Sequence, residues 1–110
     1  MMVSPDILLK RGKSMADTIA VLIKDKDQQY EGLRTSLGLL LEMAEVQMFV
    51  LNHEIADMNE AYSENMEFID EMEGERYTNN KENAKKYGFK FATNTEIGKM
   101  LKKASLVIPF

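Results

Sequence analysis

Apolar side chains recur at alternating steps of four and three residues from Leu37 to Met72, and this spacing constrains the fold more than any other feature. Such spacing places the apolar positions along one side of a helix, as in coiled coils and helical bundles. The positions are Leu37, Leu41, Ala44, Met48, Leu51, Ile55, Met58, Tyr62, Ile69 and Met72, with polar Asn65 among them. The sequence therefore predicts one long central helix over residues 36–73.

Short helices are expected before the central helix. Only two prolines, Pro5 and Pro109, occur in the chain, so little between them forbids helix. Ser4 can cap a short first helix, and Ser14 can cap a second one that runs to about Lys24. Residues 1–34 are thus predicted to hold short N-terminal helices.

Local capping signals predict two further helices after the central one. Asn80 can cap a short helix that Gly88 ends. Thr93 and Glu96 have the spacing of a capping box, which opens a last helix to about Ala104. We expect an all-α protein with a single helical domain over residues 1–110, in which a basic helical segment at 76–110 follows the central helix.

The length of the central helix predicts self-association. A helix over residues 36–73 is about 57 Å long, whereas a compact domain of this size is only about 35 Å across. Between Leu37 and Leu51, eleven of fifteen residues are also apolar, so that half needs cover on nearly every side. We expect a homo-oligomer, a dimer or higher, with the interface formed by Leu37, Leu41, Met48, Leu51, Ile55, Met58, Tyr62, Ile69 and Met72.

Charge is distributed very unevenly along the chain. Residues 35–75 contain eleven acidic side chains and no lysine or arginine, whereas residues 76–110 contain eight basic and two acidic ones. An acidic stripe is predicted on the second half of the central helix, formed by Glu54, Asp57, Glu60, Glu64, Glu67 and Glu71. Such a stripe is either a solvated face or a surface that attracts a basic partner or imitates nucleic-acid phosphates.

The basic C-terminal segment supports an alternative, nucleic-acid binding. Its candidate contacts are Lys85, Lys86, Lys90, Lys99, Lys102 and Lys103, with aromatic side chains between them. Ala84 to Gly88 has the alanine and glycine spacing of a helix-turn-helix module, although the turn that follows is too long. The opposing interpretation is that these lysines balance the acidic middle of the same or a neighbouring subunit.

No catalytic residue, cofactor site or metal site is predicted. The run HEIAD at His53 resembles a zinc-binding helix motif, but Asp57 stands where the second histidine belongs and the chain has no other histidine. The chain has no cysteine, which fits a cytoplasmic protein, and no apolar stretch reaches the length of a membrane span. No small-molecule substrate is expected.

These features favour a non-enzymatic interaction protein that binds a macromolecular partner and modulates it through an acidic helix face. Small acidic helical proteins of this kind are frequent among phage and mobile-element inhibitors of host machinery. This comparison is a general analogy and not a match to a family. The alternatives are a dimeric DNA-binding regulator that uses the basic segment, and a structural or assembly subunit.

Overall fold

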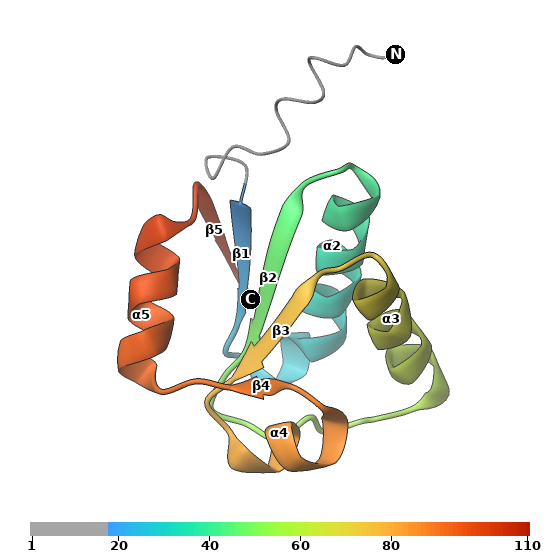
Figure 1. Ribbon diagram of the computed structural model, residues 1–110. Helices are drawn as coiled ribbons and strands as arrows, with labels where there is room; N and C mark the ends of the chain where they lie inside the picture. The colour runs from blue at the N-terminus through green and yellow to red at the C-terminus, as the bar shows by residue number, and fades with distance from the viewer. Residues whose placement is uncertain (1–17) are drawn as a thin grey trace.

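The protein has an α/β fold built on a parallel sheet, in a computed structural model that describes residues 18–110. The five strands lie in the order β4-β3-β2-β1-β5, and every neighbouring pair is parallel (Figure 1). They are β1 (Thr18–Ile23), β2 (Glu45–Val50), β3 (Glu75–Thr78), β4 (Lys90–Phe91) and β5 (Leu106–Pro109). The prediction of an all-α coiled coil or helical bundle is therefore wrong.

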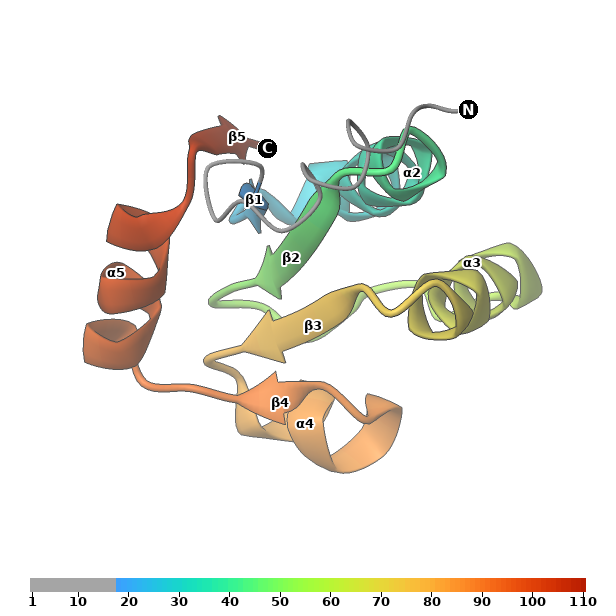
Figure 2. The ribbon, with the colours of Figure 1, turned by 45° about the horizontal axis from the view of Figure 1, so that its top comes forward.

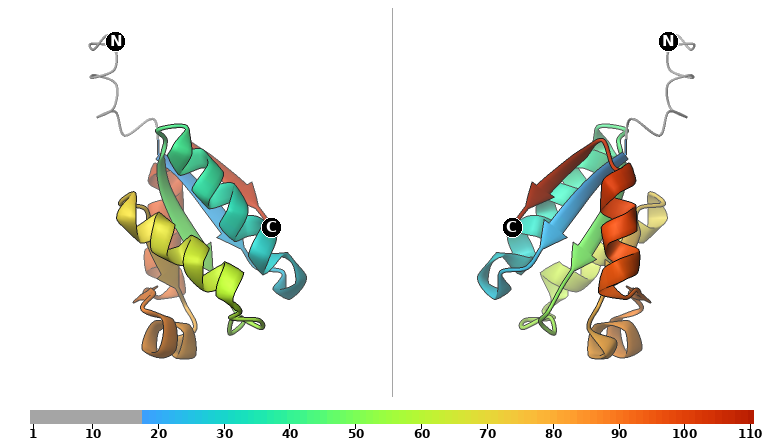
Figure 3. Two further views of the ribbon diagram at one scale, coloured as in Figure 1. Left: turned by 90° about the vertical axis from the view of Figure 1, so that its right-hand side faces the viewer. Right: turned by 90° about the vertical axis from the view of Figure 1, so that its left-hand side faces the viewer.

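Helices cover both faces of this sheet. In the described part of the chain they are α2 (Gln29–Leu41), α3 (Glu60–Glu71), α4 (Lys81–Tyr87) and α5 (Asn94–Lys103), with a short 3-10 helix η2 (Lys26–Gln28) before α2. Figures 2 and 3 show α2 and α3 on one face and α5 on the other. The chain steps outward from β1 to β4 and then returns to the far side of β1. A right-handed return of this kind requires its helix, α5, to lie on the opposite face.

The sheet face under α2 and α3 carries the larger core. Val21, Met48 and Val50 contribute from the strands, and Leu33 and Ile69 contribute from the two helices. The face under α5 carries a second core, where Phe49, Ala20 and Leu51 pack with Ile97 and Ala92. Strands β1 and β2 are thus buried on both sides.

Burial on both sides explains why the strands β1 and β2 were predicted as helix. A central strand of a parallel sheet is apolar on both faces, so its sequence shows a continuous apolar run in place of alternation. Such a run cannot be told from a buried helix by its periodicity. The predicted helix ending near Lys24 is strand β1 where the structure describes it, and the apolar stretch 45–51 is strand β2 with its first loop residue.

The predicted central helix over 36–73 consists of three separate elements. Helix α2 ends at Leu41, and Met43 then adopts a positive φ of 73° in the turn into β2. After β2, Asn52 also has a φ of 73°, and the chain remains irregular until Asn59 caps α3. Left-handed backbone of this kind cannot belong to a helix. The spacing resembled heptads because α2, β2, the loop after β2 and α3 each bury some of these apolar residues.

The two helices predicted after the central one are confirmed, but the segment 76–110 is not wholly helical, because it also contains strands β4 and β5 and most of β3. The side chain of Asn80 accepts a hydrogen bond from the N–H of Asn83 at the start of α4, and Gly88 ends that helix with a φ of 74°. Thr93 and Glu96 form both hydrogen bonds of a capping box at α5. The predicted helices beginning at Ser4 and Ser14 start outside the described residues.

Candidate binding site at the carboxyl ends of the strands

All strands of a parallel sheet end at the same edge, and the loops that follow them meet there. In open α/β sheets, ligands bind in the crevice outside the carboxyl ends of the strands. In this protein the edge is formed by residues 24–28 after β1, 51–59 after β2, 79–80 after β3 and 92–93 after β4. The loop between β2 and α3, residues 51–59, is the longest of them.

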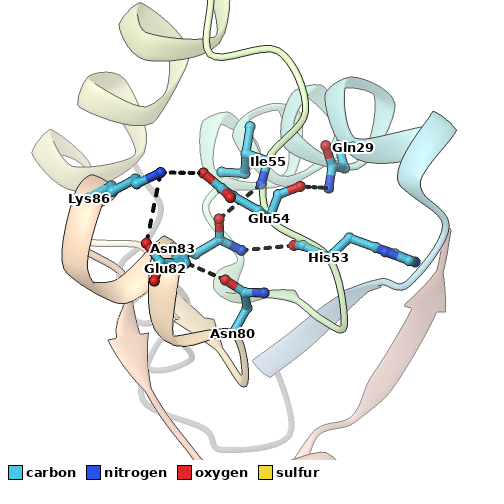
Figure 4. A network of polar contacts seen from close by, with 8 residues as sticks. All are labelled: Gln29, His53, Glu54, Ile55, Asn80, Glu82, Asn83 and Lys86. Carbon is cyan, nitrogen blue, oxygen red and sulfur yellow. Dashed lines mark hydrogen bonds and ion pairs between the residues drawn. The ribbon is translucent and has the colours of Figure 1, made fainter.

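A buried asparagine holds one side of the β2–α3 loop. Asn83 on α4 is fully buried, and its Nδ2 donates to the carbonyl oxygen of His53 at 3.0 Å. Its Oδ1 accepts from the N–H of Ile55 at 2.9 Å (Figure 4). The carboxamide therefore satisfies two backbone groups that face the same side of the loop, much as a neighbouring strand would.

A second buried amide holds the other side of the same loop. Gln29, at the start of α2, is 6% exposed. Its Oε1 accepts from the N–H of Ala56 at 2.9 Å, and its Nε2 donates to the carbonyl oxygen of Glu54 at 3.3 Å. Because successive peptide groups point in opposite directions in an extended chain, Gln29 and Asn83 approach residues 53–56 from opposite sides. An otherwise irregular loop is thereby fixed.

An exposed ion pair adds to this arrangement at the surface. The Nζ of Lys86 lies 2.9 Å from Glu54 Oε2 and 3.8 Å from Glu82 Oε1 (Figure 4). The hydrogen bond to Glu54, and then its negative charge, raise the pKa of Lys86. Exposed ion pairs contribute little to stability. The main effect of this pair is that Lys86 balances the negative charge of Glu54.

Two neighbouring hollows lie beside the clamped loop. The larger has a volume of about 360 Å³ and is lined by Lys26, His53, Glu54, Ile55 and Ala56. The smaller has a volume of about 160 Å³, shares Lys26 and Ala56, and extends to Asp57 and Tyr30. Within residues 18–110, neither Lys26 nor His53 takes part in an ion pair. The larger hollow is therefore lined by a lysine and a histidine that form no ion pair in this part of the chain, although Asp27 and Asp57 line the adjoining hollow.

Three asparagines connect further loops at this edge. Asn79 Oδ1 accepts from the backbone N–H of Asn52 at 2.7 Å, and Asn79 Nδ2 donates to Asn94 Oδ1 at 2.8 Å. Asn79 Nδ2 also lies 3.2 Å from Asn52 Oδ1. These bonds join the loops after β2 and β3 to the first turn of α5. Within residues 18–110, no group of three or more metal-ligating side chains is close enough to hold a metal ion.

The predicted interface residues lie in very different surroundings from a coiled-coil seam. Met48, Leu51, Ile55, Tyr62 and Ile69 are buried, Leu37, Met58 and Met72 are half-buried, and Leu41 is 65% exposed. Most of the set contributes to the protein's own two cores. The coiled-coil geometry on which that interface was predicted is absent from residues 18–110.

The predicted acidic stripe is divided between a helix and a loop. Glu60, Glu64, Glu67 and Glu71 are all exposed along α3, at steps of four and three residues. Asp57 is exposed in the β2–α3 loop. Glu54 belongs to the carboxyl edge of the sheet and is paired with Lys86. Only the four glutamates on α3 therefore form a stripe on one helix face.

The predicted basic contacts are distributed over three elements. Lys85 and Lys86 lie on α4, Lys90 lies on β4, and Lys99, Lys102 and Lys103 lie on α5; all six are exposed. Strand β4 separates the two helices that were compared with a helix-turn-helix module, and it pairs with β3. The Nζ of Lys90 lies 5.7 Å from the ring centre of Tyr77.

Residues Gln29, Asn79 and Asn83 were not predicted to be functional. A neutral amide in a helix gives no sign in the sequence of which backbone groups it will bind. The one available signal was the run of asparagines between Tyr77 and Asn83, which follows strand β3. That signal was interpreted as a loop and a helix cap, and Asn80 is indeed the cap.

No family model, curated protein or solved structure matches this chain. The fold and the site thus define the class of the protein only as a small α/β protein with a parallel sheet. No helix in residues 18–110 is both long enough and apolar enough to cross a bilayer.

Proposed function

We propose that this protein binds a small anionic ligand, such as a carboxylate or a phosphate, in the hollow beside residues 53–56. The observation that carries the proposal is that Lys26 and His53 line this hollow and form no ion pair within residues 18–110. The negative charge of Glu54, which also lines it, is balanced by Lys86. The proposed role is binding, without an assigned reaction.

Preorganisation supports the same proposal. A ligand pays less entropy when the loop that receives it is already ordered. Asn83 and Gln29, two buried amide side chains, hold four successive residues of the loop through four hydrogen bonds. No small-molecule substrate was expected, because the sequence shows no catalytic or cofactor signature; the parallel sheet adds an edge at which ligands bind in open α/β folds.

Titration with inorganic phosphate and with succinate, followed by amide NMR, tests the proposal. We expect shift changes confined to residues 24–28 and 51–57. The variants Lys26→Ala and His53→Ala should each weaken binding about tenfold, since a hydrogen bond to a charged group contributes about 1.5–3 kcal/mol. Lys99→Ala on α5 is the matched control. Shift changes that spread over other lysines, or that persist unchanged in both variants, would exclude this site.

A second candidate function is binding of a basic macromolecular partner by α3. The observation that favours it is Phe68, which is 52% exposed and lies among the exposed glutamates Glu64, Glu67 and Glu71. An exposed aromatic side chain within a charged rim has the composition of a binding surface. Such binding would serve the modulating role, including inhibition of host machinery, that the acidic residues suggested.

Affinity capture from the native cell with paired variants tests this second function. Phe68→Ser and the double variant Glu64→Lys, Glu67→Lys should both lose the partner, and Glu31→Lys on α2 should keep it. A partner that is retained by both α3 variants would exclude this face. DNA binding that weakens steeply with salt and is lost when Lys99, Lys102 and Lys103 become alanine would favour the regulator alternative. A cytoplasmic location is part of the proposal and rests on the absence of cysteine.

A further inference from the structure

The two edge strands of the sheet differ in how well they are protected from pairing with another chain. Strand β4 forms one edge with only two residues, one of them Lys90, and short charged edges resist pairing with other chains. Strand β5 forms the other edge, and no charged residue occurs from Ala104 to Phe110. The β5 edge therefore lacks the charged side chains that often keep a strand from pairing.

Apolar side chains are exposed on both faces of β5. Leu106 is 53% exposed and Val107 is 36% exposed. The register with β1 places Leu106 and Ile108 on the face of α2 and α3, because they pair with Ile19 and Val21. By alternation, Val107 lies on the face of α5. Within residues 18–110, both faces of this edge are only partly covered, since Ile108 is half-buried and Leu106 and Val107 are exposed.

The backbone of β5 also has outward-facing groups that no strand within residues 18–110 pairs with. Ser105 N–H donates inward to the carbonyl oxygen of Thr18 at 2.8 Å. Because backbone groups alternate, Leu106 and Ile108 direct their N–H and C=O groups outward. Pro109 falls on the inward side, where the N–H of Phe110 takes over and donates to Leu22 at 2.7 Å. The proline therefore removes no outward donor.

We propose that the β5 edge binds a second copy of this chain, with the two β5 strands antiparallel about a twofold axis at Val107. Leu106 of each copy then lies opposite Ile108 of the other, and each such pair exchanges both N–H···O bonds. The pairing is self-complementary, because both partners in each pair are outward-facing residues. The sheet becomes continuous across the two copies.

Charge is compatible with this occupant. In the antiparallel arrangement the start of one β5 lies beside the end of the other. Lys103 precedes β5, whereas Asp25 lies at its far end, where the Asp25 N–H donates to the carbonyl oxygen of Phe110 at 3.1 Å. Lys103 of one copy thus approaches Asp25 of the other. Lys24 and Lys26 alternate with Asp25 and Asp27, so this attraction is modest.

The size of the contact sets the expected strength. Stable complexes bury roughly 1,200–2,000 Å² in total, and a pair of four-residue strands lies at or below the lower end of that range. We therefore expect a dissociation constant on the order of 10–100 μM and a monomer–dimer equilibrium that depends on concentration. Light scattering of the full chain from about 5 μM to about 500 μM should show the average mass rise towards twice that of the monomer.

Cysteine substitution at the axis tests the geometry directly, since the described residues contain no cysteine. Val107 lies opposite its own copy in a non-hydrogen-bonded pair, where the Cα atoms are about 4.5 Å apart. A disulfide accepts Cα separations of about 4.4–6.8 Å. Val107→Cys should therefore form a covalent dimer under mild oxidation. Phe91→Cys, at 45% exposure on the β4 edge, is the matched control and should remain largely monomeric.

Two further measurements separate this proposal from other occupants. Val107→Lys places like charges at the axis and should keep the protein monomeric at every concentration. The amide N–H groups of Leu106 and Ile108 should become protected from hydrogen exchange only as dimer forms. A protein that stays monomeric throughout the concentration range would overturn the proposal, as would a dimer that Val107→Lys leaves intact. Protection of these amides in dilute monomer would show that another segment of the same chain covers the edge, and this result would also overturn the proposal.

Discussion

The carboxamides of Asn83 and Gln29 bind four consecutive residues of one loop, with Asn83 taking residues 53 and 55 and Gln29 taking residues 54 and 56. They come from helices α4 and α2, which are separated in the sequence by strands β2 and β3 and helix α3. The shape of the loop at the candidate site is therefore determined by two buried side chains outside it.

Asn83→Ala should destabilise the protein by about 2–3 kcal/mol, because the buried N–H of Ile55 and the partly buried carbonyl of His53 lose their partner and a buried unsatisfied group costs about 1–3 kcal/mol. Urea denaturation gives the value. Asn80→Ala, which removes only the cap of the same helix, should cost about 1 kcal/mol. Hydrogen exchange at the Ile55 amide should accelerate in the first variant and not in the second. Equal effects of the two variants would mean that Asn83 does not hold the loop.

Substitution by alanine at two glycines of α2, Gly32 and Gly38, should change the stability of the protein in opposite directions. A Cβ at Gly32 would overlap the side chain of Ile23, whereas a Cβ at Gly38 meets nothing within 4 Å. Gly32→Ala should therefore destabilise the fold by about 1–3 kcal/mol through overpacking. Gly38→Ala should stabilise it by about 0.5–1 kcal/mol through the higher helix propensity of alanine. Thermal denaturation of the two variants side by side measures both changes.

Tyr62→Phe should stabilise the protein by about 1 kcal/mol, because the buried hydroxyl has no hydrogen-bond partner within residues 18–110 and such a group costs about 1–3 kcal/mol. Tyr77→Phe is the control, since Tyr77 donates to Glu75 Oε1 at 2.9 Å. That variant should be neutral or slightly destabilised. A loss of stability in Tyr62→Phe would indicate a partner for its hydroxyl in solution.

Alkaline pH should destabilise the fold through the same tyrosines. Burial raises the pKa of Tyr62, and burial followed by the hydrogen bond to Glu75 raises the pKa of Tyr77 to about 12. Both phenols keep their proton in the folded chain at a pH where the unfolded chain loses it. Their contribution to stability is fully present below about pH 10 and is lost as the pH rises further.

Urea denaturation between about pH 9 and about pH 12 measures this loss of stability. The free energy of unfolding should fall less steeply in Tyr62→Phe than in the unmodified protein, because one titrating group is removed. Slopes that do not differ would show that Tyr62 ionises equally in both states.

The sequence was informative where structure depends on neighbours along the chain. The caps at Asn80 and Thr93, and the exposed glutamates of α3, follow from local spacing and were predicted. Strand β2 was missed because Val46, Met48, Phe49 and Val50 are all buried and leave no alternation to detect. The loop clamp was missed for another reason, since the backbone groups that Gln29 binds are adjacent to it only after the sheet has formed.

Strand order has a consequence for how the protein folds. Strand β1 acquires its second neighbour only when β5 arrives, and their register joins Ile19 to Leu106. Loop closure over such a separation is slow. Until α5 and β5 dock, Ala20 and Phe49 on the α5 face of the sheet remain uncovered. We expect an early intermediate in which β1, β2, α2 and α3 are assembled and the opposite face of the sheet is still exposed to solvent. Stopped-flow fluorescence with a dye that binds apolar surfaces would detect it as a transient rise in signal.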